Sequence, residues 1–155
     1  MSFGGGAKAS AKKKDIQRVN LLIGRLAARL GHDLCWASIQ VNVNLLSGWH
    51  IDDSKGLALV IVGGDFTGGA LEIRGVGSFD LQGQALVFDQ GSDHRVCAFQ
   101  GYRWSVVAFT HSDSSRPGAA REALELRSLG FRPSSSDLPS SIPPTRARIS
   151  KEFVG

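Results

Sequence analysis

The chain has little cysteine and no long hydrophobic run. Its two cysteines, Cys35 and Cys97, are too few for a zinc finger, and they lack the Cys-x-x-Cys spacing of a redox motif. No apolar run approaches the about 18 residues that a membrane-spanning helix needs. The first residues, MSFGGGAKASAKKK, contain no apolar segment of the kind found in secretory signals. We therefore expect reduced thiols in an intracellular protein of the nucleus or cytoplasm, with no membrane partner.

Excess charge is also scarce outside the first 14 residues. The formal net charge is +4 over 155 residues. Leaving out Lys8, Lys12, Lys13 and Lys14, 14 basic and 14 acidic side chains remain. The sequence predicts a disordered basic leader over residues 1–14. Its lysines Lys12, Lys13 and Lys14 either hold nucleic-acid phosphates non-specifically or are simply solvated.

Glycine is abundant, with 19 residues, and it separates short apolar segments. About eight such segments follow residue 38 at regular spacing, which is typical of an antiparallel sandwich or barrel. A helical pattern precedes them, with Asp15 as the expected N-cap and Gly31 as the C-terminal stop. A second helical pattern follows them, between Pro117 and Gly130.

These patterns predict a mainly β protein, a double-stranded β-helix (jelly roll) with an N-terminal and a C-terminal helix. We expect residues 15–131 to form a single domain, whose chain is long enough to bury a core. Residues 132–155 are rich in serine and proline. We expect this tail to be disordered.

Two histidines and an aspartate form a candidate metal site. In a β-strand, residues i and i+2 point the same way, so His50 and Asp52 can reach one metal ion. His94, from a later strand, would complete a set of two histidines and one carboxylate, which binds Fe(II) on one face and leaves the other positions open. On this pattern Ile51 turns into the core, and Asp53 is exposed or lies behind the ligands.

A candidate anion site lies on the last strand, YRWSVVAF. Arg103 and Ser105 share one side of this otherwise apolar strand. A guanidinium presents a planar fork that suits a carboxylate, so the pair could hold one end of a keto-acid. Asn42 and Asn44 lie on the polar side of an earlier strand and are weaker candidates for steadying the same ligand.

The segments WHIDD, GGDFTGGALEI and GQALVFDQGSDHRVCAFQGYRWSVVAF together resemble the 2-oxoglutarate- and Fe(II)-dependent oxygenases, over residues 38–110. The resemblance implies Fe(II) ligands at His50, Asp52 and His94. It also implies that Arg103 binds the far carboxylate of 2-oxoglutarate, with Ser105 beside it. It implies a dioxygenase that hydroxylates a C–H bond while 2-oxoglutarate becomes succinate and carbon dioxide, with ascorbate as a supporting reductant.

The substrate class stays open. The segment RWSVVAFTH resembles the TET/JBP group, which oxidises modified pyrimidines, and Phe109 and His111 end its strand in the same manner. That favours modified bases in nucleic acid, although two cysteines cannot supply the zinc-binding region of the animal enzymes. A prolyl-hydroxylase-like enzyme acting on protein side chains is an alternative, although such enzymes usually carry Lys at the Arg103 position. A non-catalytic jelly roll that binds only metal or ligand is another. The oligomeric state is left open.

Overall fold

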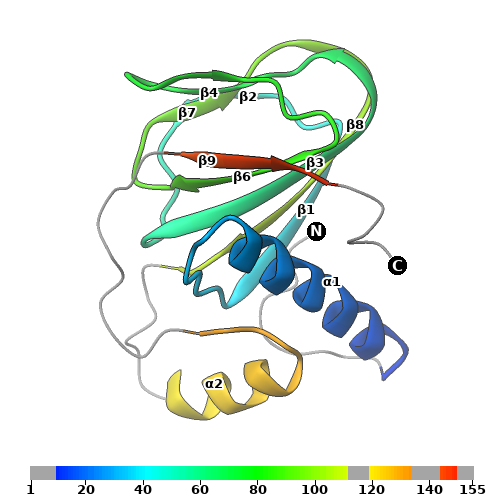
Figure 1. Cartoon of the computed structure of the whole chain (residues 1–155), viewed down its shortest axis with the longest axis vertical. Coiled ribbons are helices and arrows are strands. Elements are labelled where there is room, and N and C mark those ends of the chain that lie inside the picture. Colours follow the sequence, from blue (N-terminus) through cyan, green and yellow to red (C-terminus); the bar gives the residue numbers. More distant parts are fainter. Residues whose placement is uncertain (1–9, 112–118, 134–143, 150–155) are drawn as a thin grey trace.

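Two antiparallel β-sheets form the body of the protein (Figure 1). The structure, a computed structural model, describes residues 10–111, 119–133 and 144–149. The larger sheet has the strand order β1-β8-β3-β6-β9, and the smaller sheet has the order β2-β7-β4-β5. The strands are β1 (Ser38–Val43), β2 (Ser47–His50), β3 (Leu57–Gly68), β4 (Leu71–Ile73), β5 (Gly77–Phe79), β6 (Gln84–Asp89), β7 (His94–Val96), β8 (Phe99–Phe109) and β9 (Thr145–Arg148).

The central strand β3 is buried on both faces, which explains its unbroken apolar run LALVIV. Leu59 and Ile61 belong to the core cluster on the outer face of the large sheet. Val60 and Val62 belong to a second cluster between the two sheets. The alternation of a strand is therefore present here, but both sets of side chains are apolar.

Helix α1 (Ser10–Arg29) covers the outer face of the large sheet (Figure 1). Its residues Ile23 and Leu26 are fully buried in the outer cluster. The helix ends as predicted at Gly31, which has a φ of 76° and donates its N–H to the carbonyl of Ala28 at 3.0 Å. A positive φ at this position is the reason that glycine is favoured there.

The start of α1 corrects the predicted leader. The helix begins at Ser10, so residues 10–14 are helical and Asp15 is not an N-cap. Asp15 instead lies within the helix, 3.9 Å from Arg18, and both side chains are exposed. Alanine and lysine are strong helix formers, so a helix stabilised by packing further along can extend back through AKKK.

The C-terminal segments also differ in part from the prediction. Helix α2 (Ala119–Ser128) ends at Gly130, which has a φ of 86°. The expected start at Pro117 lies outside the described residues. The predicted disorder of the tail is wrong for Thr145–Arg148, because β9 pairs with β6 at the edge of the large sheet. An open sheet edge offers unpaired backbone groups, which a passing segment can satisfy whatever its composition.

The protein is thus mainly β, with two antiparallel sheets and two described helices, and this arrangement is compatible with a jelly roll. No described helix is both long enough and apolar enough to cross a membrane. The space between the sheets is lined by strands of both: β2, β4 and β7 contribute from the small sheet, and β1, β3, β6 and β8 contribute from the large one. The candidate functional residues lie there.

Candidate metal centre

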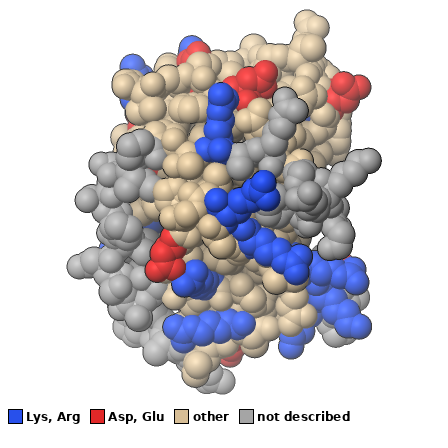
Figure 2. Space-filling model, in the orientation of Figure 1, with Lys and Arg blue, Asp and Glu red and all other residues tan. Residues whose placement is uncertain are grey.

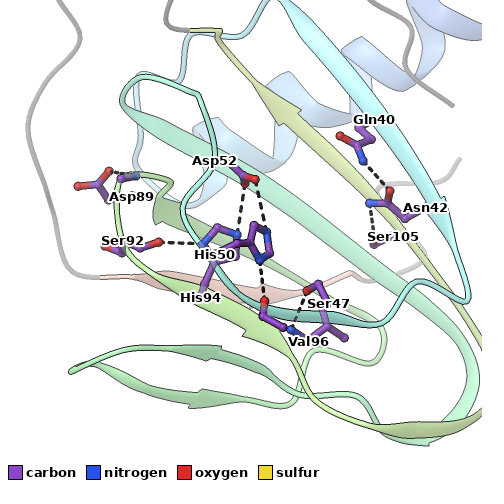
Figure 3. Close-up of polar contacts among 12 residues, drawn as sticks. Gln40, Asn42, Ser47, His50, Asp52, Asp89, Ser92, His94, Val96 and Ser105 are labelled. Carbon is purple, nitrogen blue, oxygen red and sulfur yellow. Dashed lines mark hydrogen bonds and ion pairs between the residues drawn. The ribbon is translucent and has the colours of Figure 1, made fainter.

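His50 and His94 are brought together by the pairing of β2 with β7. They are cross-strand partners at the end of these strands, and their ring centroids lie 4.4 Å apart. Asp52 follows β2 and turns its carboxylate toward both rings (Figure 3). Its Oδ1 lies 3.4 Å from His50 Nε2, and its Oδ2 lies 3.3 Å from His94 Nε2. The predicted triad is therefore assembled, with ligand atoms all within 4.8 Å of one another.

Both imidazoles are oriented by the backbone. His50 Nδ1 lies 2.8 Å from the carbonyl oxygen of Gly48, and His94 Nδ1 lies 2.8 Å from that of Ser92. A carbonyl only accepts, so Nδ1 carries the proton and donates in both rings. When the rings are neutral, this tautomer leaves both Nε2 lone pairs free to coordinate in the same space, as metal-binding histidines require. The donor set, two imidazole nitrogens and one carboxylate, fits the facial site of non-haem Fe(II).

The triad is electrostatically coupled. A hydrogen bond from His94 lowers the pKa of Asp52, against the opposing effect of burial, and the charges of His94 and His50 add to the lowering. Burial acts to lower the pKa of His94, but its hydrogen bonds to Asp52 and to the Ser92 carbonyl outweigh burial and raise that pKa. The Asp52 carboxylate is therefore ionised at neutral pH and can coordinate a cation. His94 can coordinate the same cation only after it loses the proton on Nε2.

The triad opens into a cavity of about 330 Å³ between the sheets. Arg103 lines the same cavity from β8 and is only 3% exposed. Its Nε atom is buried without a hydrogen-bond partner among the described residues. The guanidinium carbon lies 5.6 Å from the ring centre of Phe66 and 5.9 Å from that of Phe99. Burial lowers the pKa of Arg103, but a guanidinium stays charged at neutral pH. The cavity wall therefore carries a buried positive charge, the Arg103 guanidinium, which favours an anionic ligand.

A chain of polar side chains runs along the cavity wall beside Arg103. Gln40 Nε2 donates to Asn42 Oδ1 at 2.8 Å, and Asn42 Nδ2 donates to Ser105 Oγ at 3.2 Å (Figure 3). Since Ser105 Oγ accepts from Asn42, its own hydrogen is left for another acceptor. Ser105 is 4% exposed and lines the cavity, so that acceptor can be a ligand oxygen.

Asn44 has a different place from Asn42. It is exposed, lies beyond the end of β1 with a φ of 51°, and is not among the cavity-lining residues. Its Oδ1 accepts the backbone N–H of Arg103 at 2.9 Å, and its own N–H donates to the Arg103 carbonyl at 2.7 Å. Asn44 thus fixes the backbone that carries the guanidinium and does not face the ligand space.

The structure agrees only in part with the predicted places of the other residues near the site. Ile51 is 62% exposed, so its predicted burial is wrong. The chain leaves β2 at His50 and turns, with Ser54 N–H donating to the Asp52 carbonyl, and strand alternation no longer applies. Asp53 is exposed at the cavity, as one alternative had it. His111 is exposed and lines the cavity from beyond β8.

Sequence reasoning missed one buried polar residue of the cavity, Gln90. It is 1% exposed and lies in the turn between β6 and β7. The segment FDQGSDH reads as an ordinary polar turn, and the available signal was only the position of Gln90 four residues before the ligand His94.

The sequence matches no protein-family model and no curated protein. Among solved structures, the chain is similar to an oxidoreductase of the 2OG-Fe(II) oxygenase family from Burkholderia pseudomallei, with 24% sequence identity and a TM-score of 0.42. The match covers 49% of this chain and 43% of that protein. A similarity this distant and partial carries no functional argument, so the function has to be inferred from the geometry of the cavity.

Proposed function

We propose that the protein is a 2-oxoglutarate- and Fe(II)-dependent oxygenase that hydroxylates a C–H bond. One observation carries the proposal: a facial set of two histidines and one carboxylate opens into the same cavity as a buried guanidinium whose Nε has no hydrogen-bond partner in the part of the chain that the structure describes. Either feature alone has a structural explanation, such as a hydrogen-bonded histidine pair or a cation held by aromatic rings. Together they match a metal ion and a diacid bound side by side.

The strand order supports a double-stranded β-helix as the framework. From β1 to β8 the chain changes sheet at every step except between β4 and β5, which pair with each other: β1, β3, β6 and β8 belong to the large sheet, and β2, β4, β5 and β7 to the small one. This is the connectivity expected of a chain that crosses repeatedly between two four-stranded sheets, as in a jelly roll. Strand β9 is then an addition at the edge of the large sheet.

Each residue has a separate task in this proposal. His50, Asp52 and His94 hold the metal on one face, and bound Fe(II) would supply the activation of dioxygen. Arg103 binds the far carboxylate of 2-oxoglutarate, and the Ser105 hydroxyl donates to the same group. Asn42 orients the Ser105 hydroxyl through its hydrogen bond. The apolar side chains of the cluster between the two sheets keep water away from the reacting atoms.

Succinate release tests the proposal directly. The purified chain with Fe(II), 2-oxoglutarate and ascorbate should form succinate, and His94→Ala should abolish this while keeping the circular dichroism spectrum. His32→Ala is the matched control, because His32 contacts Thr145 outside the cavity. Metal and 2-oxoglutarate binding without any succinate would instead identify a non-catalytic ligand-binding jelly roll. Equal turnover by His94→Ala and His32→Ala would reject the metal assignment.

The substrate class is tested by product mass. Modified bases in nucleic acid and protein side chains are the two candidates, and no described residue specifies a TET/JBP-like enzyme. Incubation with methylcytosine oligonucleotides and, separately, with proline-containing peptides should add one oxygen to the true substrate class alone. An oxidised peptide with unchanged oligonucleotides would reject the nucleic-acid candidate.

Nucleic-acid binding through the lysine cluster is a separate proposal, which the basic face of α1 favours. Lys14, Arg18, Arg25 and Arg29 are exposed and recur on one side of the helix, and basic side chains gather over this part of the molecule in Figure 2. This face lies on the outer side of the large sheet, away from the cavity. We expect Lys13→Glu/Lys14→Glu to weaken salt-dependent retention of DNA in a gel shift. Unchanged retention would show that Lys13 and Lys14 do not contribute to DNA binding.

A further inference from the structure

Two buried side-chain polar atoms among the described residues have no hydrogen-bond partner, and both belong to residues that line the same cavity. One is Arg103 Nε, which the proposed function assigns to the co-substrate. The other is Gln90 Oε1. Native proteins rarely bury a polar atom unpaired, so each such atom in a cavity wall indicates a group that a ligand can satisfy.

Gln90 is buried in this wall and anchored through its backbone. It is 1% exposed, and its backbone N–H donates to the Gly56 carbonyl at 3.2 Å. Leaving its amide oxygen unpaired costs about 1–3 kcal/mol, the desolvation penalty of a buried acceptor. A leucine or methionine would fill the same volume without that cost, so a structural role alone does not explain a glutamine here.

The two unpaired atoms belong to side chains that enter the cavity from different segments of its wall. Arg103 pairs with Gly64 across β3 and β8, whereas Gln90 bonds to Gly56, just before β3 begins. The His94 ring packs against Phe88, two residues before Gln90, at 5.3 Å between ring centres. Gln90 therefore lines the cavity close to the candidate metal centre.

The chemistry of the amide oxygen limits the group that can pair with it. Arg103 is the only lysine or arginine among the described residues that line the cavity, and the proposed function assigns it to the co-substrate. An amide oxygen only accepts hydrogen bonds, so a fully ionised phosphate or carboxylate, which has no donor, leaves it unpaired. A neutral group with an N–H or O–H donor satisfies it.

We propose that Gln90 is a substrate-binding residue whose side-chain amide accepts a hydrogen bond from a neutral donor group, holding the neighbouring C–H near the metal. The proposal rests on the proposed function for its choice of substrate over co-substrate. It assigns the substrate's bound portion to the class of neutral amides or alcohols and excludes a phosphate at this position.

Paired small probes test the contact without turnover. The ¹⁵N-labelled full chain, loaded with Zn(II) and 2-oxoglutarate, is titrated with N-methylacetamide, which has one N–H donor, and with N,N-dimethylacetamide, which has none. The Gln90 side-chain amide resonances are identified by their loss in Gln90→Leu. We expect N-methylacetamide to shift them saturably and N,N-dimethylacetamide to bind at least several-fold more weakly.

The variants give matched controls. Gln100→Leu makes the same change at an exposed glutamine outside the cavity and should leave the titration unchanged. Gln90→Glu keeps an acceptor oxygen, so its backbone resonances around residue 90 should still respond to N-methylacetamide. If Gln90→Leu does not fold, the comparison of the two amides in the unmodified chain decides.

Equal shifts by the two amides, or no saturable shift by either, would overturn the assignment of Gln90. Failure of the oxygenase proposal has a different signature, namely the absence of succinate release or of metal binding through His94. A chain that binds N-methylacetamide at Gln90 but forms no succinate would retain this site and lose the proposed reaction.

Discussion

His50 and His94 stand as direct partners across β2 and β7, with their ring centres 4.4 Å apart and the Asp52 carboxylate between their Nε2 atoms. Without a cation, this arrangement is a hydrogen-bonded triad in which His94 holds a proton more firmly than usual. With a cation, the same three atoms become ligands, and that proton has to leave. Proton and metal therefore compete for one site.

This competition predicts opposite pH trends with and without metal. The raised pKa of His94 gives stability that is complete below its ordinary value of 6.5 and is lost as the pH rises through the raised value. The lowered pKa of Asp52 gives stability that is present above its ordinary value of 3.8 and is lost as the pH falls through the lowered value. The Tm of the metal-free chain should therefore fall as the pH rises above 6.5, while the increase in Tm on adding Mn(II) should grow. Parallel trends in the two titrations would contradict this account.

Replacing Arg103 with methionine should separate ligand binding from stability. The buried guanidinium has no carboxylate partner in the described structure, so Arg103→Met should raise the free energy of unfolding of the ligand-free chain by about 1 kcal/mol. Loss of the charge-assisted hydrogen bonds should weaken the binding of 2-oxoglutarate by about 100-fold. Urea denaturation and calorimetric titration measure the two effects, with the exposed Arg25→Met as the control. Unchanged 2-oxoglutarate affinity would reject Arg103 as its anchor.

Asn44 should act on the ligand only through the backbone of Arg103. Asn44→Ala removes the hydrogen bond from the Arg103 N–H. It also places alanine, which tolerates the left-handed conformation less well than asparagine, at a φ of 51°. We expect a loss of about 1–2 kcal/mol in the free energy of unfolding. Asn44→Gly relieves the backbone and should lose less. Both variants should weaken the binding of 2-oxoglutarate and leave the affinity for Mn(II) unchanged. An equal loss of the two affinities would point to general unfolding instead.

Two glycines with the same backbone conformation offer a test of the space around Arg103. Gly69 and Gly75 have φ values of +69° and +75°. A β-carbon at Gly69 would lie 3.1 Å from both Cδ and Nε of Arg103, whereas at Gly75 it would meet nothing within 4 Å. Each alanine variant should lose about 1 kcal/mol through backbone strain. Gly69→Ala alone should also weaken 2-oxoglutarate binding, several-fold, by displacing the guanidinium. Equal affinities in the two variants would show that the contact does not matter.

Local sequence signals predicted the parts of the fold that depend on neighbouring residues. Gly31 and Gly130 end their helices because the backbone needs a positive φ there, and this need is visible in the sequence. The start of α1 and the strand β9 were not predictable in the same way. Helix extension to Ser10 and edge pairing by Thr145–Arg148 depend on packing and on an open sheet edge elsewhere in the chain.

The sequence by itself indicated which side chains could bind a metal and a diacid, because His50 and Asp52 lie two residues apart and strand alternation places Arg103 with Ser105. The tertiary structure decided their use. Only the register of β2 against β7 brings His94 to the other two ligands, and only the packing of the two sheets buries Arg103 and Gln90 with unpaired polar atoms in one cavity. Residue spacing is a local property of the chain, whereas burial and convergence depend on contacts between segments far apart in sequence.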